Sequence, residues 1–412
     1  MRCLSLLLSL ALLPSLIAPS ALNDDNNPEL LWQTDRPIPY AFSANFSDQY
    51  RQEVTNVLDC LQLRTCLSFE HLHSFEEPYR NDTVLYFLNS TECSSDVGKN
   101  SSLKLQELNI ASYCHSEGII PHEILHALGL DHTHSRHDRD TYITIVDSET
   151  AEDYEYEKMS EEENKNFGVK YDFHSLMHYP ADLKNGRPNM LANDPFYQHA
   201  MGCNSEGPAH SDLLLINRLY KCLDRCDGRL TVCEHGGFLN PNNCEKCVCP
   251  SGFDGDACEA VNPGFDSDGN PCSEALFAAE EWTFLDRESA SATCYYHIKA
   301  KAGTQIEIDL LEIGPESSES TCTSRRENSR IEMRLGSFEI GGYVFFCDSQ
   351  VPKSVLRSTG HLAVITLKAM KAKSGFKMKF RSIIPPERKL EDRSRTSLKA
   401  LLLSSVDVDY CY

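Results

Sequence analysis

The sequence predicts a large α+β domain, a small crosslinked module and a β-sandwich, in that order along the chain. Strand-like and helix-like runs mix in the first half, six cysteines crowd into residues 226–258, and short alternating stretches follow. A chain of 412 residues is long enough for two or three domains, at least one of them with a sizeable hydrophobic core.

The first residues have the features of a secretory signal peptide. A basic start precedes an apolar run from Leu4 to Ile17 and a small-residue end. We expect cleavage near Ser20, which makes residues 1–20 the signal and residues 21–30 a short pro-segment. A signal anchor is the alternative, but the run is shorter than the roughly 20 residues that a bilayer span needs. The protein is therefore expected to be secreted, extracellular and not membrane-bound.

Residues 31–222 mix the two types of secondary structure. Ile38–Phe42 and Thr83–Leu88 are strand-like, while Ser47–Leu63 is predicted to be a helix that begins with a Ser or Asp cap. The acidic run Asp147–Glu163 is expected to be a solvated face or loop rather than a surface that guides a substrate. An α+β domain follows from this mixture.

The remaining chain divides by its cysteines and its periodicity. Residues 226–258 are too few and too rich in cysteine to fold on a hydrophobic core, so disulfides must hold them. Thr304–Leu310 and His361–Leu367 alternate between apolar and polar residues, which favours a β-sandwich. Residues 384–412 are predicted to be a flexible polar tail.

Cysteine content and charge restrict the environment and the partners. Eighteen cysteines behind an export signal indicate a disulfide framework, and loss of Cys3 with the signal leaves an odd number. A net charge of -22 argues against nucleic acid or an anionic membrane as the main partner. Sequons for N-glycosylation occur at Asn45, Asn81, Asn89 and Asn100.

The run from His122 to His132 has the spacing of a metal site. His122 and His126 stand four residues apart, so on a helix both imidazoles project from one face. Glu123 lies on the same helix, near enough to reach a metal-bound water. Gly129 permits a sharp turn that brings His132 back as a third nitrogen ligand. Three histidines leave one open position on a zinc ion.

A chance match and a structural zinc site are the alternatives. Gly129 and His132 extend the pentapeptide to five fixed identities, which makes a chance match rare. A structural site usually closes all four positions with protein ligands, many of them cysteine. Met177 follows at the place of the methionine turn of metzincins, although a buried methionine alone is most often core packing.

Together, His122–Ile143 and Ser175–Tyr179 resemble the astacin family of zinc endopeptidases, and the likeness extends over residues 31–222. It implies an α+β metzincin domain with one zinc ion in its cleft, acting on protein or peptide substrates. It further implies three zinc ligands, a general base and a tyrosine ligand that swings to stabilise the oxyanion, namely His122, His126, His132, Glu123 and Tyr179.

The same resemblance implies the disulfides Cys66–Cys222 and Cys93–Cys114. Thr133 stands where astacins usually have glutamate, so the buried salt bridge to a newly released amino terminus cannot form in the usual way. Asp24 or Asp25 could occupy the zinc in a latent form, but the short pro-segment lacks the family's switch motif.

Residues 223–259 are similar to an EGF-like domain, and residues 272–383 resemble a CUB domain. A cysteine zinc cluster is the alternative for the first of these, and an exported chain disfavours it. The disulfides that the two resemblances imply are Cys226–Cys244, Cys233–Cys247, Cys249–Cys258, Cys272–Cys294 and Cys322–Cys347.

Three cysteines remain after these pairs. We expect Cys60 to pair with Cys203, and Cys411 to stay free or to form a covalent dimer. Two functions are then open. The first is a secreted zinc endopeptidase whose EGF-like and CUB-like modules localise the substrate. The second is a catalytically silent extracellular binding or matrix protein, which the complete set of site residues disfavours.

Overall fold

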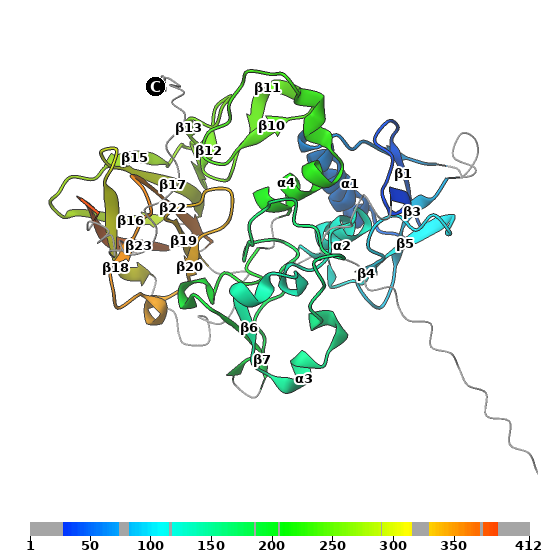
Figure 1. Cartoon of the computed structure of the whole chain (residues 1–412), viewed down its shortest axis with the longest axis horizontal. Coiled ribbons are helices and arrows are strands. Elements are labelled where there is room, and N and C mark those ends of the chain that lie inside the picture. The colour runs from blue at the N-terminus through cyan, green and yellow to red at the C-terminus, as the bar shows by residue number, and fades with distance from the viewer. Residues whose placement is uncertain are drawn as a thin grey trace, which may run out of the picture.

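The computed structural model describes residues 28–73, 82–114, 118–184, 187–204, 207–289, 291–314, 329–370 and 374–385 (Figure 1). Several expectations fall outside these ranges. They are the signal peptide, most of the pro-segment, the sequon at Asn81, the tail after residue 385, Cys322 and Cys411.

The first half of the first domain is a five-stranded sheet with two helices. The strand order is β2-β1-β3-β5-β4, with parallel pairs except for β4 against β5. The expected helix is α1, and the Ser47 hydroxyl caps it by accepting the N–H of Tyr50 at 3.2 Å. The elements are β1 (Ile38–Phe42), α1 (Asp48–Arg64), β2 (Phe69–His71), β3 (Val84–Asn89), β4 (Ser94–Ser95), β5 (Leu105–Ile110) and α2 (Ile119–Ala127), after the short helix η1 (Pro28–Leu30).

The second half of this domain consists of short elements that surround one longer helix, α4 (His210–Leu219). The Cys66–Cys222 bond ties the end of this half back to the end of α1. The short elements are η3 (Thr133–Ser135), η4 (Arg139–Thr141), β6 (Ile143–Ile145), α3 (Ser148–Ala151), η5 (Tyr154–Tyr156), β7 (Leu183–Lys184), β8 (Arg187–Pro188), β9 (Met190–Ala192), η6 (Pro195–Tyr197) and η7 (Cys222–Cys226). Strand β6 pairs with β9, and β7 pairs with β8.

The cysteine-rich module contains two small antiparallel hairpins, and three disulfides crosslink it. Its strands are β10 (Phe238–Asn240), β11 (Asn243–Val248), β12 (Phe253–Asp254) and β13 (Ala260–Val261). The bonds Cys226–Cys244, Cys233–Cys247 and Cys249–Cys258 have the pairing that the EGF-like resemblance implies.

The last part is a β-sandwich, as predicted. One sheet has the order β14-β17-β22-β19-β20 with β15 beside β17, and the other has the order β16-β23-β18-β21. The predicted strands are found in β18 and β22. The elements are β14 (Phe265–Asp266), β15 (Glu274–Phe277), β16 (Thr283–Ser289), β17 (Ala292–Lys299), β18 (Gln305–Gly314), β19 (Arg330–Arg334), β20 (Tyr343–Phe345), η8 (Asp348–Gln350), β21 (Leu356–Arg357), β22 (Leu362–Ala369) and β23 (Ser374–Ile383).

Outside the cysteine-rich module, the structure confirms three of the expected disulfides and contradicts one. Cys66–Cys222, Cys93–Cys114 and Cys272–Cys294 are present. Cys347 is disulfide-bonded, and its pairing with Cys322 stays a prediction because Cys322 lies outside the described residues.

The expected bond between Cys60 and Cys203 is wrong, because both are free thiols. Cys60 lies on α1, which packs on the core of the first sheet. Cys203 is buried in a different cluster, where its Sγ lies 3.8 Å from the Nδ1 of His174. A disulfide needs two Cα atoms roughly 4.4–6.8 Å apart, and thiols in separate cores do not meet this condition.

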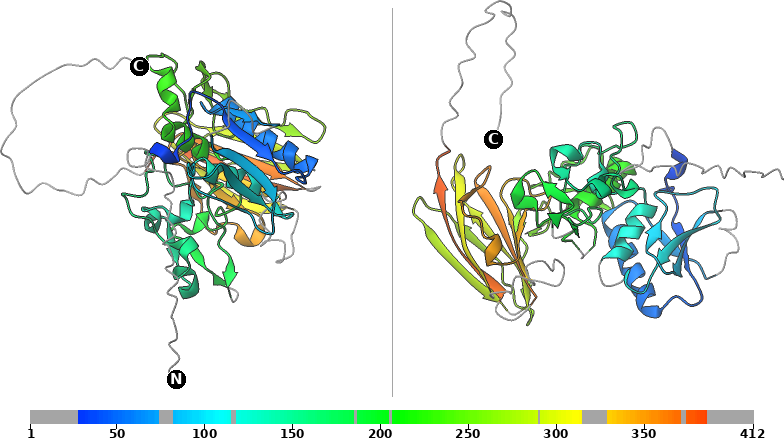
Figure 2. Two further views of the ribbon diagram at one scale, coloured as in Figure 1. Left: turned by 90° about the vertical axis from the view of Figure 1, so that its right-hand side faces the viewer. Right: turned by 90° about the horizontal axis from the view of Figure 1, so that it is seen from below.

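The EGF-like module lies between the first domain and the sandwich and contacts both (Figure 1). The Nε2 of His210 on α4 donates to the carbonyl oxygen of Gly236 at 2.9 Å, and the Nε2 of His297 on β17 donates to that of Gly252 at 2.9 Å. Figure 2 shows the sandwich at one end of the molecule and the first sheet at the other. The second half of the first domain also touches the sandwich directly, since the Nε2 of His174 lies 3.0 Å from the carbonyl oxygen of Gly342.

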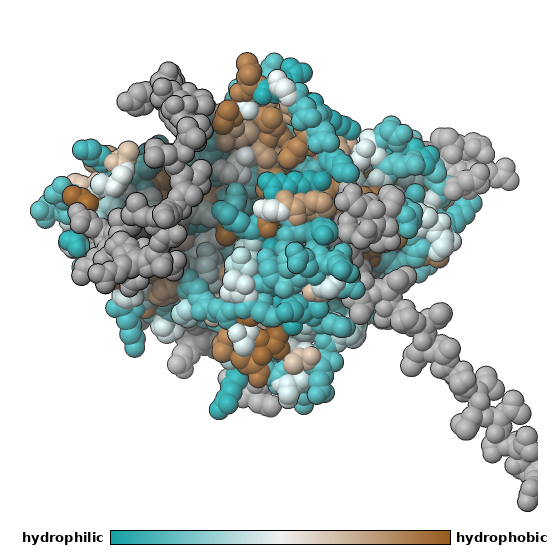
Figure 3. Space-filling view, in the orientation of Figure 1, coloured by the Kyte–Doolittle hydropathy of each residue, from teal (hydrophilic) through white to brown (hydrophobic). Residues whose placement is uncertain are grey.

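A hydrophobic cluster joins these two parts. Val344 and Phe346 of the sandwich pack with Tyr171 and Phe173 of the first domain. Apolar residues also gather at the surface over β10 and β11 and over the region of β6 and β7, while the rest of that face is mainly hydrophilic (Figure 3). Within the described ranges, no helix is both long enough and apolar enough to cross a bilayer.

Candidate metal centre and active site

Helix α2 carries the first two histidines and Glu123 on the buried face of the first domain. Gly118 precedes the helix with a φ of 70°, and Gly129 follows it with a φ of 98°. The left-handed conformation at Gly129 turns the chain sharply, as glycine permits. His132 thereby returns to the face of α2 that carries His122 and His126.

The three histidines converge through their Nε2 atoms. The Nε2 of His132 lies 3.3 Å from that of His122 and 3.2 Å from that of His126. Three nitrogens that bind one tetrahedral zinc ion at about 2.0–2.1 Å lie about 3.3 Å apart, so the observed spacing fits this metal. Among the described residues, these histidines form the one group with metal-ligand spacing.

The outer nitrogens set the tautomers of the first two histidines. The Nδ1 of His122 lies 2.9 Å from the carbonyl oxygen of Leu176, and the Nδ1 of His126 lies 2.7 Å from that of Leu130. Because a carbonyl oxygen only accepts, each Nδ1 carries the hydrogen and each Nε2 keeps its lone pair for a metal.

Burial keeps two of the histidines neutral. It lowers the pKa of His126 and His132 well below the ordinary value, and the neighbouring histidines lower both values further. Neutral imidazole is the form that binds zinc. The donor set therefore fits zinc in chemistry as well as in spacing.

Glu123 lies in a cleft of about 390 Å³ that His122, Tyr156 and Tyr179 also line. Its side chain is buried, and burial, followed by the charge of Glu155, raises the pKa of Glu123 to about 8. A neighbouring cation would oppose this shift, since an opposite charge favours the carboxylate. Glu123 is thus a buried carboxyl group that faces the cleft beside His122.

The segment Ser175–Tyr179 passes beside the histidines. Met177 is buried in the core cluster that includes α2, and its carbonyl oxygen accepts the N–H of Thr133 at 2.9 Å. The ring of Tyr179 lies 4.3 Å from that of His132, centroid to centroid. The structure therefore brings together His122, Glu123, His126, His132, Met177 and Tyr179, as predicted from the sequence.

Glu155 also reaches the site, which the sequence interpretation missed. Its Oε2 accepts the hydroxyl hydrogen of Tyr179 at 3.1 Å and lies 3.6 Å from the Nδ1 of His132. The acidic run around it was expected to be a solvated face or loop, and most of its carboxylates are exposed. Tyr156 interrupts the acidic run and is buried, so it was the available signal of a more buried position.

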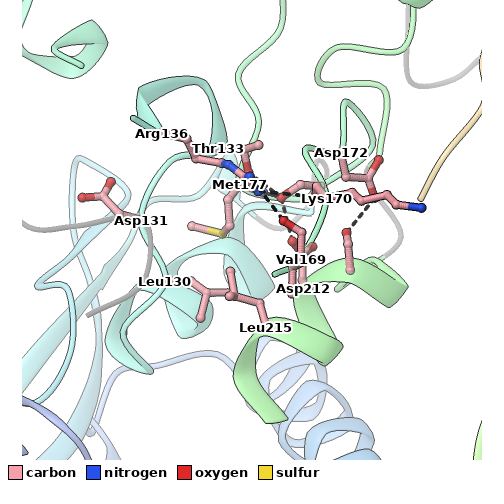
Figure 4. Close-up of a pocket in the computed structure, with 12 residues that line it drawn as sticks. Leu130, Asp131, Thr133, Arg136, Val169, Lys170, Asp172, Met177, Asp212 and Leu215 are labelled. Atoms are coloured by element: carbon pink, nitrogen blue, oxygen red, sulfur yellow. Dashed lines mark hydrogen bonds between the residues drawn. The ribbon is translucent and has the colours of Figure 1, made fainter. Parts of the chain in front are cut away.

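Thr133, which follows the third histidine in sequence, belongs to a buried hydrogen-bond chain that reaches Asp212 (Figure 4). Its hydroxyl donates to the Ser175 hydroxyl at 2.8 Å, which donates to Oδ1 of Asp212 at 2.6 Å. The adjoining cavity has a volume of about 20 Å³, room for about one water molecule. The Thr133 hydroxyl thus contacts Ser175 at the position where astacins usually carry glutamate.

Comparisons with known proteins agree with this geometry. The family model described as Astacin, a family of peptidases, matches residues 24–221. The zinc metalloproteinase nas-27 of Caenorhabditis elegans is 32% identical over 372 residues, which cover 84% of each chain. The chain belongs to the astacin family. As an astacin it is a zinc-dependent metalloendopeptidase that hydrolyses protein or peptide substrates, and the silent binding protein is not favoured.

Two further astacin-family matches have the same character. The zinc metalloproteinase nas-23 of Caenorhabditis elegans is 30% identical over 387 residues, which cover 90% of this chain and 68% of the relative. The solved structure of high choriolytic enzyme 1, a hatching enzyme zinc-protease from Oryzias latipes, is 26% identical with a TM-score of 0.40. That match covers 49% of this chain and 98% of the medaka chain.

Proposed function

We propose that His122, His126 and His132 hold the zinc ion, that Glu123 is the general base and that Tyr179 stabilises the oxyanion. The observation that carries this proposal is the convergence of three Nε2 atoms beside a cleft that His122 and Glu123 line. When bound, zinc lowers the pKa of a water ligand towards 7 and polarises the carbonyl of the scissile bond.

The residues of the chain supply the rest of the chemistry. Glu123 takes a proton from the attacking water and returns it to the leaving amine, which its position in the cleft beside His122 supports. The hydroxyl of Tyr179 donates to the oxygen that becomes negative, a contact often worth about 3 kcal/mol.

Substitution of Glu123 tests this division of roles. Glu123→Gln should bind zinc stoichiometrically and lose about 10²- to 10⁴-fold in kcat/KM on a casein-derived peptide, because the amide cannot accept the proton. His126→Ala should lose zinc. Glu107→Gln, on the exposed face of β5, is a matched control that should retain both zinc and activity. Cleavage at the wild-type rate by Glu123→Gln would contradict the assignment.

The domain division and the setting of the protein belong to the same proposal. In this proposal the chain consists of a signal at 1–20 that is removed, a pro-segment at 21–30, a peptidase domain at 31–222, an EGF-like domain at 223–259, a CUB-like domain at 272–383 and a tail at 384–412. The enzyme is secreted and cuts extracellular proteins, and the two accessory domains localise the substrate. The paired cysteines of both accessory domains support an oxidising compartment.

Modification and assembly complete the proposal. The described sequons at Asn45 and Asn89 are exposed, which supports glycosylation there, and Asn100 is half-buried. Cys411 either stays free or links two copies. A Cys411→Ser variant that runs like the wild type on a non-reducing gel would exclude the covalent dimer.

A further inference from the structure

The outer nitrogens of the three histidines have different kinds of partner. Those of His122 and His126 donate to backbone carbonyls, whose positions the fold fixes. The Nδ1 of His132 has two carboxylates as neighbours, Asp131 Oδ1 and Glu155 Oε2, each at 3.6 Å. The carboxylates nearest to the third histidine therefore belong to side chains, and outer partners of metal-binding histidines influence both affinity and activity.

The two carboxylates are not equivalent. Oδ1 of Asp131 already accepts the backbone N–H of His132 at 2.5 Å, so its position follows that of its neighbour in sequence. Oε2 of Glu155 comes from a different segment and also accepts the hydroxyl of Tyr179 at 3.1 Å. One oxygen of Glu155 thus contacts both the third histidine and the catalytic tyrosine.

The backbone of Glu155 is held in place by the residues that directly follow His132. Its carbonyl oxygen accepts hydrogen bonds from the Nε2 of His134 at 3.0 Å and from the hydroxyl of Ser135 at 3.1 Å. Its N–H donates to Oδ1 of Asp153 at 3.1 Å, which caps η5. Short helix η5 is therefore attached to η3, and the direction of the Glu155 side chain follows from this attachment.

We propose that Glu155 is a positioning residue that supports the Nδ1 side of His132 and holds the hydroxyl of Tyr179 beside the site, from where its one hydrogen bond passes from Oε2 of Glu155 to the oxyanion as that charge forms. The inference deepens the proposed function and rests on the roles given there to His132 and Tyr179. The side chain of Glu155 is 32% exposed, so solvent screens its charge. The expected effect of Glu155 therefore lies in the orientation of its neighbours more than in folding stability.

The two contacts of Glu155 can be separated by substitution. Glutamine keeps an oxygen that accepts the Tyr179 hydroxyl but removes the negative charge beside His132. Alanine removes both. Glu155→Gln should therefore bind zinc more weakly and keep most of kcat when saturated with zinc, whereas Glu155→Ala should lose both properties.

The experiment measures zinc affinity by competition with a chromophoric chelator, and kcat and KM separately at saturating zinc. We expect about a tenfold loss of zinc affinity in both variants, within the 10–100-fold range of outer-partner substitutions. We expect about a tenfold loss of kcat in Glu155→Ala alone, with KM changed by less than about twofold. In a Tyr179→Phe background, Glu155→Ala should lower kcat no further, because the hydroxyl that it holds is absent.

Glu157→Ala is the matched control, because it removes an exposed carboxylate two residues along the same segment. Circular dichroism and thermal unfolding show whether each variant folds. If Glu155→Ala does not fold, Glu155→Gln still tests the inference, because glutamine retains the shape of the side chain. Zinc affinity and kcat within twofold of the control for both variants would overturn the inference. Failure of the proposed function looks different, because wild-type protein would then lack zinc or Tyr179→Phe would cleave normally.

Discussion

The Nε2 of His174 lies 3.0 Å from the carbonyl oxygen of Gly342, and this contact joins the peptidase domain to the CUB-like sandwich. Beside it, the N–H of Gly341 donates to Oδ1 of Asp172 at 3.1 Å. His174 directly precedes the segment that carries Met177 and Tyr179. The sandwich therefore supports the segment that carries Tyr179.

Gly341→Ala tests this support. A Cβ atom at Gly341 would lie 2.0 Å from Cγ of His174, so the imidazole or the loop must move. Overpacking of this kind costs about 1–3 kcal/mol, and we expect a lower Tm together with a lower kcat/KM. Gly360→Ala is the control, since a Cβ there meets no atom within 4 Å. Equal Tm and activity in the two variants would show that the loop does not support the site.

Acid should weaken the attachment of the EGF-like module. Burial lowers the pKa of His210 and of His297 to about 4, although their hydrogen bonds to Gly236 and Gly252 act in the opposite direction. Below pH 6.5 the unfolded chain protonates these side chains while the folded chain does not. The stabilisation is complete above pH 6.5 and is lost as the pH falls towards 4, on the order of 2 kcal/mol per histidine.

Urea unfolding at pH 7, 6, 5 and 4 measures this loss. His297→Gln and His210→Gln keep a side-chain donor but do not titrate, so each should have a shallower dependence on pH than the wild type. Comparison with the wild type removes the contribution of the zinc-site histidines, which all three proteins share. Identical slopes in the wild type and both variants would be inconsistent with the buried, neutral histidines.

The two free thiols should differ in reactivity. Cys60 is partly exposed on α1, whereas Cys203 is fully buried at the contact with the sandwich. We expect an alkylating reagent to modify Cys60 in the native enzyme and Cys203 only after denaturation, as peptide mass spectrometry will show. A disulfide-linked pair of peptides that contain Cys60 and Cys203 would contradict the structure, in which both thiols are free.

Thr133→Val removes the first hydrogen bond of the chain to Asp212. Its partner, the Ser175 hydroxyl, then loses a donor in a buried place, which should cost about 1–2 kcal/mol of unfolding free energy. Thr144→Val on β6 removes a hydrogen bond at an exposed place and should cost less than about 0.5 kcal/mol. Chemical denaturation of both variants gives the comparison, and equal losses would exclude a structural role for the Thr133 chain.

Sequence alone was sufficient for the residues of the site that are close together in the chain. His122, Glu123 and His126 share one helix, and Gly129 explains the return of His132, so the fixed geometry of a helix and a turn determines their positions. Strand β18 was likewise visible in its alternation, whereas β22 is a nearly continuous buried run and was visible as an apolar stretch.

Two features depend on contacts between distant segments, and local patterns do not report these. Glu155 approaches His132 only because η5 is attached to η3, while its neighbours in sequence are solvated. The pairing of Cys60 with Cys203 was inferred from the number of cysteines left over, which contains no information about distance.

The Cys66–Cys222 bond encloses all the residues for which we propose a catalytic or zinc-binding role, from His122 on α2 to Tyr179. If the enzyme cuts its own chain once inside this loop, the two fragments stay covalently joined. A non-reducing gel would then show an intact band for a nicked molecule, and a preparation judged pure in this way could contain autolysed enzyme. Comparison of reduced and non-reduced samples is therefore the appropriate measure of how much active peptidase a preparation holds.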